Sequence, residues 1–131
     1  MKTIRVFLVD DERAVRQGLR MRLDMERDLA VVGEAADGQS ALTAISAALP
    51  DVVLMDVELP VLDGIEATAA LRKSAPACAV VMLSMHDDAE TRARAIAQGA
   101  AGFVSKSHMD GALLDAIRRA AASVNTHEAG N

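Results

Sequence analysis

A run of apolar residues near the middle of the chain, ended by an aspartate, restricts the possible folds most strongly. Four apolar residues follow one another from Val52 to Met55, and Asp56 comes directly after them. Such an uninterrupted run is typical of a strand buried on both faces of a parallel sheet. Ligands of open α/β sheets bind beyond the carboxyl ends of the strands, and a carboxylate buried there needs a partner. Asp56 is therefore a candidate site residue.

The length and composition predict one domain with an aliphatic core. Of the 131 residues, 51% are hydrophobic but only 2% are aromatic. The apolar runs are too short for a membrane span and the first residues do not resemble a signal peptide, so we expect a cytoplasmic protein that binds no membrane. The lone Cys78 excludes an internal disulfide. The net charge of -5 argues against nucleic-acid binding by this chain itself.

Apolar segments alternate with amphipathic ones along the whole chain. The strand-like segments are residues 4–9, 29–35, 51–57, 79–84 and 102–105, and the helical patterns between and after them cover about 12–25, 37–49, 63–75, 88–98 and 110–124. This alternation predicts an α/β fold, a doubly wound five-stranded parallel sheet with five helices on its two faces. We expect residues 1–124 to form the domain and the polar residues 125–131 to form a linker or tail.

Polar residues stand where the strands are expected to end. Asp10 and Asp11 follow the first strand, Asp56 ends the third, Ser84 ends the fourth and Lys106 follows the fifth. Three neighbouring carboxylates repel one another unless a cation lies between them, and Mg²⁺ is the hard cation that suits carboxylates, water and phosphate. A lysine and a hydroxyl group beside them would stabilise a phosphoryl group attacked by a carboxylate.

With Pro60, Asp63-Gly64 and Gly102-Phe103-Val104-Ser105-Lys106, these residues resemble the receiver domain of two-component response regulators, the CheY-like fold. The resemblance extends from about Ile4 to Val124. It implies the strand order 2-1-3-4-5, a histidine kinase as partner and Mg²⁺ as cofactor.

The resemblance also assigns roles to individual residues. It implies that Asp56 is the phosphoacceptor, that Asp11 binds Mg²⁺ directly and Asp10 through water, and that the backbone carbonyl of Glu58 is a further ligand. Lys106 would hold the phosphoryl oxygens.

Ser84 and Phe103 would form the family's conformational switch, which accompanies formation of a homodimer on phosphorylation. Within the family, residues 15–20 and 29–38 are most similar to receivers of the NarL/LuxR type, which carry a C-terminal helix-turn-helix domain that binds DNA. We expect this chain to be the receiver part of such a regulator. The alternative is a stand-alone receiver.

Several positions differ from the family pattern or vary within it. Ser107 replaces the proline that often follows the lysine, so we expect a trans peptide bond there. Glu58 and His86 occupy variable positions that either set the phosphorylation rate or are solvated loop residues. The arginines of the first helix form an outer stripe that is either solvated or meets an acidic partner: Arg13, Arg16 and Arg20.

Two other classes of protein fit less well. A phosphohydrolase with an aspartyl nucleophile would have Asp-x-Asp near the first strand, whereas Asp56-Val57-Glu58 lies on the third. A flavodoxin-type module needs a phosphate-binding loop after the first strand, where Asp10 and Asp11 would repel phosphate.

Overall fold

The computed structural model describes residues 2–85, 88–107 and 109–129. Strands and helices alternate along the chain: β1 (Ile4–Val9), α1 (Arg13–Asp24), β2 (Leu29–Ala35), α2 (Gly38–Ala48), β3 (Val52–Asp56), α3 (Gly64–Ser74), β4 (Ala79–Ser84), α4 (Ala89–Ala97), β5 (Gly102–Ser105) and α5 (Ala112–Ala129). The predicted alternation is confirmed.

The end of the last helix was predicted wrongly. We expected it to end at Val124, but α5 continues to Ala129. The sequence contains neither glycine nor proline between Gly111 and Gly130, so neither of the two strongest helix-breaking residue types occurs before Gly130. That residues 125–131 link to another domain stays a prediction.

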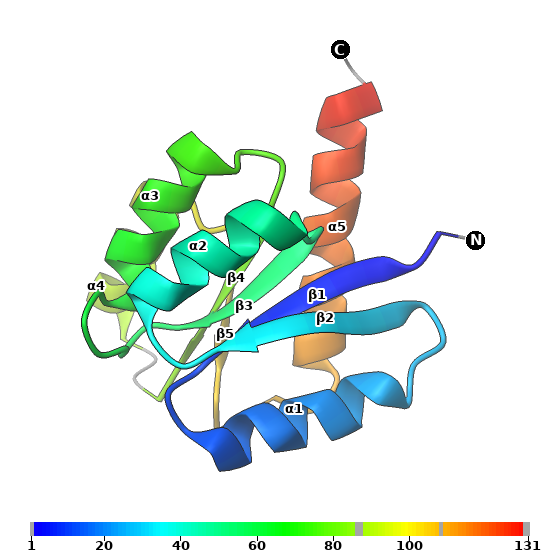
Figure 1. Ribbon diagram of the computed structural model, residues 1–131, viewed down its shortest axis with the longest axis horizontal. Helices are drawn as coiled ribbons and strands as arrows, with labels where there is room; N and C mark the ends of the chain where they lie inside the picture. Colours follow the sequence, from blue (N-terminus) through cyan, green and yellow to red (C-terminus); the bar gives the residue numbers. More distant parts are fainter. Residues whose placement is uncertain (1, 86–87, 108, 130–131) are drawn as a thin grey trace.

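The five strands form one parallel sheet in the order β2-β1-β3-β4-β5, as the resemblance implied. Helices α1 and α5 cover one face, and α2, α3 and α4 cover the other (Figure 1). Because all strands run in one direction, their carboxyl ends share one edge, on the left of the sheet in Figure 1. Among the described residues, we find no helix that combines the length and the apolar character needed to cross a bilayer.

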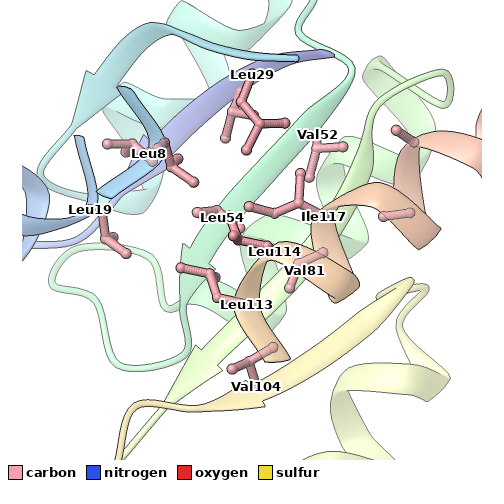
Figure 2. Packing of buried hydrophobic residues seen from close by; sticks show 14 of the residues in the cluster. Leu8, Leu19, Leu29, Val52, Leu54, Val81, Val104, Leu113, Leu114 and Ile117 are labelled. Atoms are coloured by element: carbon pink, nitrogen blue, oxygen red, sulfur yellow. The ribbon is translucent and has the colours of Figure 1, made fainter. Parts of the chain in front are cut away.

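Side chains of the central strands alternate between two separate cores. Leu54 belongs to the core beneath α1 and α5, where Figure 2 shows it beside Leu114 and Ile117. Met55 points the other way, into the core beneath α2 and α3. All four residues from Val52 to Met55 are fully buried, so β3 is a central strand, as its apolar run predicted.

Candidate functional site

The carboxyl ends of β1 and β3 bring three carboxylates together. Asp10, Asp11 and Asp56 each offer an oxygen, and these oxygens lie within 4.8 Å of one another. The two strands are neighbours in register Val9 to Met55, which places Asp10 beside Asp56. Asp10 and Asp56 are buried, at 0% and 5% exposure, whereas Asp11 is exposed. The predicted acidic cluster therefore exists and is open to solvent on its Asp11 side.

Lys106 joins this cluster from the end of β5. Its Nζ atom lies 2.7 Å from Oδ2 of Asp10 and 3.2 Å from Oδ2 of Asp56. The remaining carboxylate oxygens accept backbone hydrogen bonds: Oδ1 of Asp10 from the N–H of Glu12 at 2.9 Å, and Oδ1 of Asp56 from the N–H of Glu58 at 3.2 Å. These bonds fix the planes of both buried carboxylates.

Burial and the neighbouring charges shift the pKa values of Asp56 and Lys106. Burial raises the pKa of Asp56 to about 6; the charge of Lys106 opposes this rise and the charge of Asp10 adds to it. Burial lowers the pKa of Lys106. Its hydrogen bond to Asp10 and the nearby carboxylate charges raise the pKa by more than burial lowers it, so the net shift is upward. At neutral pH Asp56 is thus mostly ionised and Lys106 protonated.

Ser84 and Phe103 lie on the opposite face of the sheet from Asp56. Ser84 ends β4, one position beyond Leu83, the register partner of Asp56, and it is buried at 1% exposure. Side chains alternate along a strand, so Ser84 and Phe103 share the face of Met82, which packs beneath α2 to α4. The Phe103 ring is partly buried, and the guanidinium carbon of Arg92 in α4 stands 4.7 Å from its centroid.

The loop after Asp56 is tied closely to the strand end. Asp63 caps α3 by accepting a hydrogen bond from the N–H of Glu66 at 2.9 Å. The N–H of Gly64 donates to the carbonyl of Val57 at 2.8 Å, and a Cβ atom at Gly64 would collide with the backbone carbonyl of Asp56. Glycine is therefore required here by close backbone approach.

The arginine stripe of α1 was only partly understood from the sequence. Arg16 and Arg20 both pair with Glu34 of β2, at 2.8 and 2.7 Å, so these two are not simply solvated, whereas Arg13 is exposed. That the stripe meets an acidic partner stays a prediction. The Nη1 atom of Arg16 also donates to the backbone carbonyl of Asp10 at 2.7 Å. The predicted strand order offered a signal for the pairing with Glu34, because it places the end of β2 beside the end of β1, where the chain leads into α1.

Two further expectations concern the loops near the site. The described residues contain no cis peptide bond, so the bond between Lys106 and Ser107 is trans, as predicted. His86 lies outside the described residues.

The donor set suits a hard divalent cation. Three carboxylates and one ammonium group leave two negative charges when all four are ionised, and carboxylate oxygens are ligands that Mg²⁺ prefers. Asp10, Asp11 and Asp56 are the residues that would hold it.

Comparison with known proteins decides the family. The family model "Response regulator receiver domain" matches residues 6–118. The chain belongs to this family. An acidic triad of this kind is typical of the Mg²⁺ site of receivers.

Relatives of this receiver include transcriptional regulators. It is 39% identical over 118 residues to "Uncharacterized transcriptional regulatory protein YxjL" of Bacillus subtilis, covering 90% of this chain and 54% of the relative. It is 38% identical over 114 residues to "Probable transcriptional regulatory protein NarL" of Mycobacterium tuberculosis, covering 87% and 53%. The receiver thus spans about half the length of the curated relatives that it matches.

Solved structures agree with this assignment. A two-component response regulator of the LuxR family from Aurantimonas sp. SI85-9A1 matches with a TM-score of 0.89 and 37% identity, over 93% of this receiver and 87% of that chain. The response regulator domain of Thermotoga maritima CheB matches with a TM-score of 0.87 and 35% identity, over 92% and 98%. The predicted similarity to NarL/LuxR-type receivers is confirmed.

Proposed function

We propose that Asp56 accepts a phosphoryl group from a histidine kinase in a Mg²⁺-dependent reaction. The observation that carries the proposal is the buried Asp56 carboxylate in contact with Lys106, within 4.8 Å of two further carboxylates. A structural ion pair would need only one acid for each lysine. Two additional acids beside one lysine are suited to a cation and to a phosphoryl group.

Each residue then has a defined task. An oxygen of Asp56 attacks phosphorus, the bond between phosphorus and the donor nitrogen breaks, and an acyl phosphate forms. When bound, Mg²⁺ neutralises the phosphoryl oxygens and the acids that hold it. The N–H of Glu58 fixes the attacking carboxylate of Asp56, and the backbone carbonyl of Glu58 would be a further metal ligand. Lys106, which contacts Asp56 before the reaction, then donates a hydrogen bond to a phosphoryl oxygen.

The response to phosphorylation would pass through Ser84 and Phe103. Ser84 would move toward the new phosphoryl group, and Phe103 would leave the guanidinium of Arg92 and turn inward. This change would promote a homodimer. We further propose that the receiver controls transcription through a DNA-binding domain. Relatives at 38–39% identity, named as transcriptional regulatory proteins, support a role in transcription. A stand-alone receiver would instead act through a separate partner.

Acetyl phosphate labelling tests the phosphoacceptor directly. With Mg²⁺, the wild-type protein should gain the mass of one phosphoryl group, and EDTA should prevent the gain. Asp56→Asn should gain none, whereas Asp24→Asn, a matched change at an exposed carboxylate, should be labelled like the wild type. Equal labelling of Asp56→Asn, or no labelling of the wild type, would contradict the proposal. Sustained turnover of small phosphoesters would instead support a phosphohydrolase.

A further inference from the structure

Arg16 connects the acidic loop to strand β2 through two different bonds. Its Nη1 atom donates to the backbone carbonyl of Asp10 at 2.7 Å, and its Nε atom donates to Oε1 of Glu34 at 2.8 Å. The side chain is only 15% exposed. Glu34 is held in turn by Arg20 at 2.7 Å, and the hydrogen bonds from Arg20 and Arg16 keep the pKa of Glu34 below its usual value. Arg16 is therefore held firmly at its outer end.

The bond to Asp10 bears on Asp11, although Arg16 contacts neither carboxylate through this bond. The carbonyl of Asp10 and the N–H of Asp11 belong to one planar peptide unit. Fixing the carbonyl oxygen therefore fixes the orientation of the unit that leads into Asp11. Asp11 is exposed, and its carboxylate is the member of the triad with least packing around it.

We propose that Arg16 is a positioning residue for the Mg²⁺ site, acting through the peptide between Asp10 and Asp11. The inference rests on the proposed function, since it concerns the same metal. It requires arginine rather than lysine, because a guanidinium group can donate in two directions at once while an ammonium group on a flexible stem cannot reproduce that geometry.

Electrostatics alone predicts the opposite result, which makes the inference testable. Removing a positive charge beside an acidic site should tighten cation binding if charge were the main effect. If positioning is the main effect, removal of Arg16 should weaken Mg²⁺ binding, on the order of 10-fold, as for other groups that orient metal ligands.

The experiment is a Mg²⁺ titration of the unphosphorylated protein by isothermal calorimetry and by ¹H–¹⁵N NMR. Arg16→Gln and Arg16→Lys should both weaken Mg²⁺ binding and move the amide resonance of Asp11. Arg20→Gln is the matched control: it removes a bond to the other carboxylate oxygen of Glu34 but leaves both bonds of Arg16 in place. It should therefore leave the Mg²⁺ dissociation constant within about twofold of wild type. Thermal unfolding in EDTA records any loss of stability separately.

The outcomes distinguish this inference from the proposed function. The positioning role alone is overturned if the wild-type protein binds Mg²⁺ and Arg16→Gln binds it equally or more tightly. It is also overturned if Arg16→Lys binds Mg²⁺ with wild-type affinity. Equal weakening by Arg20→Gln also overturns it, because the effect would then come from general loosening of the ion-pair network. Failure of the wild-type protein to bind Mg²⁺ overturns the proposed function and this inference with it.

Discussion

Replacing Asp56 with asparagine should stabilise the metal-free protein, because the fold disfavours ionisation of this carboxylate. Burial is the main cause that raises the pKa of Asp56 from 3.8 to about 6. The difference between these values corresponds to about 3 kcal/mol. Because the pKa is higher in the folded state, this contribution is present below about pH 4 and is lost as the pH rises from about 4 to about 6.

Asparagine cannot ionise, so the variant avoids this loss. Above about pH 7 the free energy of unfolding of Asp56→Asn should exceed that of the wild type by about 2–3 kcal/mol, or about 10 °C in Tm. Below about pH 4 the two proteins should converge. The amide oxygen of asparagine can still accept the hydrogen bond from Glu58.

Urea unfolding in EDTA, followed by far-UV circular dichroism, measures this difference, since the chain has neither tryptophan nor tyrosine to report by fluorescence. Measurements at about pH 4, 6 and 8 cover the titration of Asp56. The exposed control Asp24→Asn retains Asp56 and should follow the pH dependence of the wild type over the same range. Equal stability of wild type and Asp56→Asn at the highest pH, or a difference that persists at the lowest, would refute the reasoning.

Three further substitutions probe the same region by urea unfolding in EDTA. Lys106→Met leaves the fully buried Asp10 carboxylate without its 2.7 Å partner and should lower the free energy of unfolding by about 3–5 kcal/mol; a change below about 1 kcal/mol would argue against a buried ion pair. Val61 is a β-branched residue at φ 71° and is 83% exposed, so Val61→Asn should raise the free energy of unfolding by about 1 kcal/mol. A lower free energy of unfolding in this variant would show that the loop is not strained. Gly64→Ala forces a methyl group against the carbonyl of Asp56 and should cost at least about 2 kcal/mol; wild-type stability would mean that the loop can move away.

The sequence predicted the fold well because two simple patterns are clear in it: uninterrupted apolar runs in the strands and one apolar face in each helix. The uninterrupted run from Val52 to Met55 is typical of a strand covered on both faces, and the structure buries it fully. The helices around it have a single apolar face. Parallel strands end at one edge, so residues far apart in sequence were expected to meet there. Asp10 and Lys106, 96 residues apart, do so at 2.7 Å.

Features that depend on side-chain reach or on backbone conformation were not predictable in this way. Arg16 follows the same helical spacing as Arg20, and no periodicity reveals that one of them reaches a carbonyl of the acidic loop. The positive φ of Val61 contradicts the preference of its residue type, and is imposed by the tight loop between β3 and α3. The contact of Arg92 with Phe103 depends on how α4 packs against β5.

Locating the phosphoryl group on the chain tests the central claim most directly. After acetyl phosphate treatment with Mg²⁺, borohydride reduction of the acyl phosphate followed by peptide mass spectrometry identifies the modified residue. We predict modification at Asp56 only, and none when Mg²⁺ is removed. Modification at Asp10 or Asp11 instead, or labelling of Asp56 that is independent of Mg²⁺, would contradict the role assigned to the acidic cluster.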